Sequence, residues 1–232
     1  MVNRVLFIAA AAVLLMIEPV HADIVWTLPG SYTGNPLATS YTFTQSGNDL
    51  TAYGYNSTAT ISSMPESLLL TGTTDLSAKN GGIGETGVGI QSDSQKEINT
   101  TSTVALDLSS SYSSAYGDVT ITIGSVQKNE GFAVFGGSLP TSTPTTGSPY
   151  KLSDYLGQFT NSGSSNVVYT FIVTPTEMAA AKDVLYVTAA SGNVVIQTVA
   201  MSSVPEPGTL TMLFTGLASA TGLGWYRRRK AA

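Results

Sequence analysis

Four acidic residues lie close together in the middle of the sequence, in segments where we expect strands to end. They are Glu85, Asp93, Glu97 and Asp107. Calcium is bound by about six to eight oxygen atoms from carboxylates and loop carbonyls, so this group is a candidate structural calcium site. No Asp-x-Asp-x-Asp-Gly loop accompanies it, and solvated surface carboxylates are the simpler interpretation. We expect no other cofactor.

Paired carboxylates can also hydrolyse glycosidic bonds when they are roughly 5–10 Å apart. Residues 23–203 contain thirteen Asp and Glu residues, so a pair at such a distance is expected by chance. A carboxylate-dependent glycosidase is therefore an alternative function only, and we predict no catalytic residues.

Imidazole and thiol chemistry is almost absent from the sequence. The chain has no cysteine and one histidine, His21, which lies in a segment that we expect to be removed. Without cysteine there is no disulfide, thiolate nucleophile or sulfur-ligated zinc. Without histidine, Ser-His-Asp catalysis and His-ligated metals are excluded. We therefore predict that the mature protein is not an enzyme.

A glycine-rich run from Gly82 to Gly87 fits the dinucleotide-binding pattern Gly-x-Gly-x-x-Gly letter by letter. That mechanism requires a helix to begin directly after the glycines, but the residues that follow, Val-Gly-Ile-Gln-Ser-Asp-Ser, do not favour one. The sequence predicts a structural role instead, in which the glycines allow positive φ or a close approach of two backbone segments.

Aromatic side chains give two interpretations. Exposed rings can stack on sugars, whereas rings on strands are more often part of the core or of cross-strand pairs. We favour the core, and keep carbohydrate binding as an alternative. The residues concerned are Trp26, Tyr32, Tyr53, Tyr55, Tyr112, Tyr116 and Tyr150.

Ice binding is a variant of the binding hypothesis, and it usually requires a flat ladder of Thr-x-Thr in regular repeats. The sequence supplies Thr42 with Thr44 and Thr120 with Thr122. These pairs do not recur at a regular interval, so the sequence favours this variant less than the other binding functions.

The charge of the body argues against nucleic acid as a partner. Residues 23–203 hold five lysines, no arginine and thirteen carboxylates, a net charge of −8. Phosphate backbones are bound by clusters of Lys and Arg, and this segment has no such cluster.

Short segments rich in β-branched and aromatic residues recur along the body, and Val119–Ile123 alternates strictly between apolar and polar residues. Such segments predict an all-β fold, an antiparallel β-sandwich or jelly roll. We expect strands at Ile24–Leu28, Thr39–Gln45, Leu50–Tyr55, Leu68–Leu70, Val88–Ile90, Val104–Leu108, Val119–Ile123, Phe132–Phe135, Val167–Val173, Val184–Thr188 and Val194–Val199.

The segments between these strands suggest other elements. Ser191-Gly192-Asn193 indicates a hairpin turn, and Gly136–Gly147 indicates a surface loop. Short helical turns are expected near Leu152–Phe159 and over Pro175–Ala181.

The N-terminus is typical of a secretory signal peptide. Arg4 is followed by an apolar run, Val5–Ile17, and by a Val-x-Ala end at Ala22. This run is shorter than the roughly 20 residues that span a membrane. We predict a signal helix over 1–22 with cleavage after Ala22.

The C-terminus has three parts in order. Val204-Pro205-Glu206-Pro207 is followed by nineteen uncharged residues and then by Arg227, Arg228, Arg229 and Lys230. Nineteen helical residues extend roughly 28 Å, close to the thickness of a hydrocarbon core. The four cations would stay on the cytoplasmic side by the positive-inside rule. We therefore predict a transmembrane helix in the inner membrane.

This arrangement resembles the PEP-CTERM sorting signal of exported bacterial proteins. The resemblance implies that an exosortase-type membrane protease recognises Pro205, Glu206 and Pro207 and removes the tail. It also implies a Gram-negative host, an intermediate anchored in the inner membrane, and a destination at the cell surface or in the extracellular polysaccharide. A plain C-terminal anchor is the alternative.

The sequence thus predicts three parts: a signal peptide at 1–22, an exported β-sandwich at 23–203 and a sorting tail at 204–230. The function that we predict is a non-catalytic protein of the cell surface or of the biofilm matrix. The alternatives are a carbohydrate- or calcium-binding module, with exopolysaccharide as a possible partner, and the glycosidase.

Overall fold

Strands account for nearly all regular structure in the computed structural model, which describes residues 23–28, 36–61, 66–81, 84–113 and 116–204. Residues 23–202 form one compact unit. The predicted signal peptide, the transmembrane helix and the cation cluster lie outside the described residues, as do Pro205, Glu206 and Pro207. Among the residues described, no helix is long and apolar enough to cross a bilayer.

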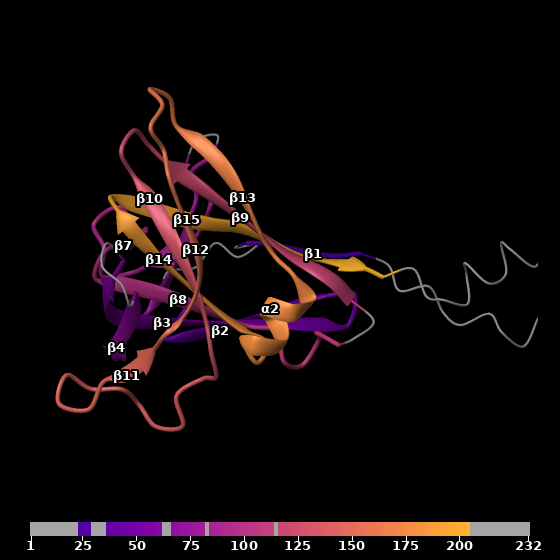
Figure 1. Cartoon of the computed structure of the whole chain (residues 1–232). Helices are drawn as coiled ribbons and strands as arrows, with labels where there is room; N and C mark the ends of the chain where they lie inside the picture. The colour runs from indigo at the N-terminus through magenta and orange to yellow at the C-terminus, as the bar shows by residue number, and fades with distance from the viewer. Residues whose placement is uncertain (1–22, 29–35, 62–65, 82–83, 114–115, 205–232) are drawn as a thin grey trace, which may run out of the picture. The chain divides into compact units, whose positions relative to one another are not determined.

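The first sheet has seven strands and runs β13-β9-β15-β6-β5, with β1 and β7 also paired to β15 (Figure 1). Its strand pairs with resolved register are all antiparallel. The bounds are β1 Ile24–Thr27, β5 Leu76–Lys79, β6 Gly87–Ile90, β7 Ile98–Asn99, β9 Tyr116–Val126, β13 Val167–Val173 and β15 Asn193–Ser203.

The second sheet has eight strands and runs β11-β4-β3-β8-β14-β10-β12, with β2 paired to β3. It too is antiparallel. The bounds are β2 Ser40–Gln45, β3 Asn48–Thr60, β4 Ser67–Thr73, β8 Ser102–Asp107, β10 Gly131–Gly136, β11 Tyr150–Leu152, β12 Asp154–Thr160 and β14 Val184–Ser191.

One apolar core holds the two sheets together. It takes alternate residues from strands of both sheets, as in Ile121 and Ile123 of β9 and Leu185 and Val187 of β14, all fully buried. Side chains on a strand alternate between its two faces, so the period-2 pattern directs one face of each sheet to the shared core. The two antiparallel sheets confirm the all-β prediction.

The second sheet also buries its other face. Phe135, Leu152 and Tyr186 belong to a separate apolar cluster there, against which Leu139 packs. Leu139 lies in the chain between β10 and β11, the segment predicted to be a surface loop (Figure 1). This loop therefore contributes to a second, smaller core.

The predicted helical turn near the end of the body is confirmed as α2, Pro175–Ala180. Thr174 caps it: the Thr174 hydroxyl accepts a hydrogen bond from the backbone N–H of Glu177, and the Glu177 carboxylate accepts one from the backbone N–H of Thr174. This reciprocal arrangement is a capping box, and Pro175 adds a preset φ at the first turn.

Two local predictions were wrong. Residues 152–159 form no helical turn but lie in β11 and β12, because β12 pairs with β10 and its Phe159 lies opposite Phe132. Ser191–Asn193 is a turn with Gly192 at φ +66°, yet it is not a hairpin. It joins β14 of the second sheet to β15 of the first. The short strands β5, β7 and β11 were also not predicted.

Candidate functional site

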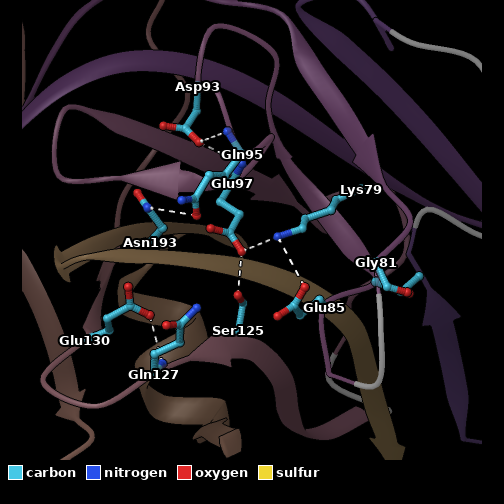
Figure 2. Close-up of polar contacts among 11 residues, drawn as sticks. Lys79, Gly81, Glu85, Asp93, Gln95, Glu97, Ser125, Gln127, Glu130 and Asn193 are labelled. Atoms are coloured by element: carbon cyan, nitrogen blue, oxygen red, sulfur yellow. Dashed lines mark hydrogen bonds and ion pairs between the residues drawn. The ribbon is translucent and has the colours of Figure 1, made fainter. Parts of the chain in front are cut away.

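A buried charged group, rather than a cation cage, occupies the region where calcium was predicted (Figure 2). Lys79, the last residue of β5, places its Nζ 2.5 Å from Oε1 of Glu97. The same Glu97 oxygen accepts a hydrogen bond of 2.5 Å from the Ser125 hydroxyl. The Glu97 side chain is 2% exposed and that of Lys79 is 16% exposed. Glu85 lies on the outer side of Lys79, with its Oε2 3.8 Å from Nζ.

A β-bulge explains how Ser125 reaches this group. Val167 pairs with Val126 and Tyr169 with Ile123, so β9 has one residue more than β13 between these pairs. Gly124 and Ser125 therefore lie opposite Val168 alone, and Ser125 has φ +60°. A bulge redirects a side chain relative to the regular pleat. At this bulge, the Ser125 hydroxyl donates a hydrogen bond to the buried carboxylate of Glu97.

Asp93 has a different role. Its Oδ1 accepts hydrogen bonds from the backbone N–H groups of Gln95 at 2.8 Å and Glu97 at 3.4 Å. Its Oδ2 accepts one from the side-chain amide of Asn99 at 3.0 Å. Asp93 thus organises the turn that carries Glu97 into its buried position.

Asp107 belongs to the second sheet, at the end of β8, where it accepts a hydrogen bond from the backbone N–H of Ser109. Within the described part of the chain, no group of three or more His, Cys, Asp or Glu side chains could hold a metal ion. The four predicted ligands therefore do not fit one shared calcium site. Calcium binding itself stays a prediction.

The glycine-rich run leads into strand β6, not into a helix. Gly84 has φ +81°. A Cβ on Gly89 would lie 2.2 Å from the carbonyl oxygen of Lys96, and one on Gly87 would lie 2.6 Å from that of Ile196. Gly84 and Gly87 of the run thus allow a positive φ and a close backbone approach, which supports the structural interpretation, and Gly89 just beyond the run has a close approach of its own. Gly82 lies outside the described residues.

Three of the aromatic residues considered for sugar stacking, Trp26, Tyr55 and Tyr116, are buried, whereas Tyr53, Tyr112 and Tyr150 are partly buried. Trp26 is 2% exposed, and its indole N–H donates to the carbonyl of Asn48. Tyr55 is buried in the outer cluster of the second sheet, where Tyr53 and Tyr150 pack against it. Burial raises the pKa of Tyr55 to about 12. Tyr32 lies outside the described residues.

The outer cluster is also closed by hydrogen bonds. The hydroxyls of Tyr150 and Tyr186 both donate to the carbonyl oxygen of Ser138, at 3.0 and 2.8 Å. Burial raises the pKa of Tyr186 far above its usual range. These two tyrosines therefore hold the β10–β11 loop against the sheet, with Tyr186 fully buried and Tyr150 partly buried.

Two of the predicted tyrosines do meet at a pocket. Tyr112 and Tyr116 line a hollow of about 420 Å³ beside α2, together with Pro175, Lys182 and Asp183 among its lining residues. The hollow combines two rings with an ammonium group and a carboxylate. Rings and hydrogen-bonding groups are the combination that small-molecule pockets use to bind and orient a ligand.

The backbone at this pocket is unusual. Lys182 and Asp183 have φ +50° and +62°, a conformation that costs energy for residues other than glycine. Hydrogen bonds maintain it: the Asp183 N–H donates to the carbonyl of Met178, and its own carbonyl accepts from Leu108. Burial, and then the charge of Asp107, raise the pKa of the Asp183 carboxyl.

A second hollow, of about 260 Å³, has only neutral side chains among its described lining residues. Thr100, Gln158 and Thr160 supply polar groups, and Ala59 and Ile61 supply apolar ones. No aromatic ring is among the described residues that line it.

The threonine pairs differ in their surroundings. In β2, Thr42 bonds the Thr51 hydroxyl and Thr44 donates to Asp49. In β9, Thr120 and Thr122 alternate with the buried core residues and lie opposite Ile172 and Thr170 of β13. Ice binding stays a prediction.

The comparison with protein families gives a match in the C-terminal segment. The protein-family model of the PEP-CTERM protein-sorting motif matches residues 203–230. The chain carries a PEP-CTERM sorting signal. The protein is therefore exported through a membrane-anchored intermediate, and an exosortase, a membrane protease, processes it. No curated protein matches the chain.

The PEP-CTERM signal begins where the described body ends. Val204, the first residue of the predicted sorting motif, follows β15 directly and is 41% exposed. At the other end of the body, Ile24 of β1 pairs with Met201 of β15. The first and last strands of the body are thus neighbours in one sheet.

Sequence reasoning missed Lys79, Lys182 and Asp183. Lys79 lies in a short strand that has no strong pattern of its own, and its partner Glu97 is 18 residues away. Lys182 and Asp183 are conspicuous only through their positive φ angles. No sequence pattern indicated either environment.

Proposed function

We propose that this protein is a non-catalytic component of the cell surface or extracellular polysaccharide matrix of a Gram-negative bacterium. The PEP-CTERM signal at residues 203–230 is the observation that carries the proposal. The body supports it: two sheets on one core, net charge −8, and no cysteine or histidine between residues 23 and 203. The acids considered for chemistry hold turns, strand ends or a buried lysine instead.

Replacing Pro205, Glu206 and Pro207 by alanine tests the sorting step. We expect the precursor to remain in the inner membrane at its full mass, because the protease no longer recognises the tail. Fractionation combined with intact-mass analysis measures both effects. Replacing Thr209 and Thr211, in the same tail but outside the motif, is the matched control and should leave sorting unchanged.

Arrival of the triple variant at the surface with the normal mature mass would contradict the sorting proposal. The proposed role in the matrix has a separate test. If it is right, the mature wild-type body should stay with the polysaccharide fraction after washing. Recovery of the body entirely in the free medium would contradict that role and leave the sorting step untouched.

Carbohydrate binding at the pocket beside α2 is a second candidate function. The observation that favours it is the meeting of Tyr112 and Tyr116 with Lys182 and Asp183 around one hollow. A sugar ring offers both a stacking face and hydroxyl groups for such a set. Strain in the backbone at Lys182 and Asp183 adds support, since strained residues cluster at ligand sites.

Calorimetric titration with neutral and uronic-acid oligosaccharides tests this candidate. We expect Lys182→Gly, which keeps the backbone conformation and removes the ammonium group, to weaken binding about tenfold, a change of roughly 1.4 kcal/mol. Lys128→Ala removes an exposed ammonium group elsewhere and should have no effect. Absence of heat with every oligosaccharide would rule out the pocket as a sugar site, and a calcium titration of the same sample tests the calcium alternative.

A further inference from the structure

The outermost strands of the two sheets differ in how they are protected. An exposed strand edge offers unpaired N–H and C=O groups to another chain, and proteins usually block it with charges, bulges, glycine or short strands. β5 has four residues and ends in Lys79, and β11 has three residues and contains Lys151. β12 begins with Asp154 and has its own irregularity near Gly157, which has φ +154°.

β13 lacks these protections. It has seven residues, Val-Val-Tyr-Thr-Phe-Ile-Val, without charge, glycine or proline. Among the residues that the structure describes, its only ladder partner is β9. The bulge in this pair adds its extra residue to β9, so β13 itself stays regular over its length. Figure 1 shows β13 running beside β9.

The two faces of β13 are distinct. Tyr169 and Phe171 pack against the core, and Tyr169 stacks on Phe159 with ring centroids 4.0 Å apart. Val168, Thr170 and Ile172 are exposed. Val168 is 50% exposed and Ile172 56%, the two highest values among the large apolar side chains described. The inner face of β13 thus packs against the core, whereas its outer face is exposed and available to a partner.

We propose that β13 pairs with β13 of a second copy, antiparallel about a twofold axis at Thr170. Thr170 is the central residue, so this register uses all seven residues. It places Val168 of one copy opposite Ile172 of the other, and Thr170 opposite its own equivalent. A pair of identical strands related by a twofold axis is a closed, self-complementary interface, and apolar cross-strand neighbours stabilise such pairs.

Charge makes this edge a better place for a second copy to bind than other parts of the surface. Two bodies of net charge −8 repel each other, so they associate best where neither copy presents a charge. The flanking residues are also neutral: Asn166 would lie opposite Thr174, and Ser165 opposite Pro175. Pro175 has no backbone N–H to donate, so the ladder ends there. The pairing is thus limited to one strand from each copy.

The absence of cysteine from the chain allows a direct test. Thr170→Cys in the full chain introduces the only thiol, and the proposed axis brings it beside its own equivalent. Opposite residues of antiparallel strands have Cα atoms about 4.5 or 5.5 Å apart, which suits a disulfide. We expect a covalent dimer under mild oxidation, formed at least about tenfold faster than with Gln158→Cys, an exposed position on β12.

The register gives a second readout. Val168→Cys and Ile172→Cys should each give little dimer alone, but a mixture of the two chains should give the cross-linked pair. Equal rates for Thr170→Cys and Gln158→Cys, or cross-linking of Thr170→Cys only to another protein, would overturn the proposal.

Charge variants test the same edge without a cross-link. A chain with Val168→Lys and Ile172→Lys, and another with Val168→Glu and Ile172→Glu, should each sediment as monomers, because like charges then face each other across the axis. Mixing the two should restore dimers. Both positions are exposed, so the fold should be retained. A wild-type chain that stays monomeric at all concentrations, or two charged chains that stay apart when mixed, would also overturn it.

Discussion

Glu97→Ala is expected to lower the free energy of unfolding by about 3–5 kcal/mol, the range found when one partner of a buried ion pair is removed. The Lys79 side chain is 16% exposed, and its ammonium group makes its short contact with Oε1 of Glu97. Without that oxygen the charge is left with Glu85 at 3.8 Å, a side chain that is 35% exposed. The Ser125 hydroxyl loses its acceptor in the same step. Urea unfolding followed by circular dichroism measures the change.

A double-mutant cycle separates the pair from its surroundings. Lys79→Met alone should also destabilise strongly, since it leaves the Glu97 carboxylate buried with the Ser125 hydroxyl as its remaining donor. Lys79→Met combined with Glu97→Met removes both charges and should recover most of the loss, because buried ion pairs are often replaceable by apolar residues of similar volume. Losses that simply add in the double variant would show that the two charges do not act as a pair.

The first and last strands of the body pair with each other between the two predicted cleavage regions. Ile24 pairs with Met201, and Trp26 with Val199, so β1 and β15 fix each other through backbone hydrogen bonds. Ala22 and Val204 both lie beyond this pairing. Cleavage after Ala22 and within the sorting tail would therefore leave in the body every described core residue, from Ile24 to Met201. The domain limits at 22 and 203 stay predictions that intact-mass analysis of the mature protein can test.

The sequence predicted those strands whose own residues show a clear pattern of apolar and polar side chains. Val119–Ile123 alternates strictly because one face of β9 is buried and the other is not, and it is a strand as expected. Asp154–Thr160 has no such alternation, and it is a strand because β10 pairs with it. β7 has only two residues, held by pairing with Asn193 and Val194. Interactions between distant segments decide these elements, and no local pattern records them.

For the candidate site, too, the sequence predicted some features and missed those that depend on contacts between distant segments. Proximity in sequence suggested that four carboxylates share one ion, but Asp107 ends β8 of the second sheet, whereas Glu97 lies in the turn just before β7 of the first. The buried partner of Glu97 is Lys79 at the end of β5, and a bulge in β9 adds Ser125. The sequence does reveal the sorting tail, because a membrane protease reads that segment as a linear signal.

Gly89→Ala is expected to destabilise the body by about 3 kcal/mol, the upper part of the range for overpacking a well-packed interior. A Cβ at this position would lie 2.2 Å from the carbonyl oxygen of Lys96 and 2.7 Å from Cα of Glu97. These are backbone atoms of the turn that Asp93 holds, so they cannot rotate away as a flexible side chain could. Moving them would also displace the Glu97 carboxylate from Lys79. The effect of Gly89→Ala should therefore overlap with that of Glu97→Ala and not add to it.

Gly147→Ala is the matched control, because nothing lies within 4 Å of a Cβ built there. It should change the free energy of unfolding by less than about 1 kcal/mol, with any gain coming from a less flexible unfolded chain. Chemical denaturation of both variants gives the comparison. Equal stability of the two would mean that the β6–β7 turn adapts to a side chain, and that close backbone approach does not explain the glycine at position 89. A large loss at position 89 alone would show that Gly89 serves the packing that places Glu97.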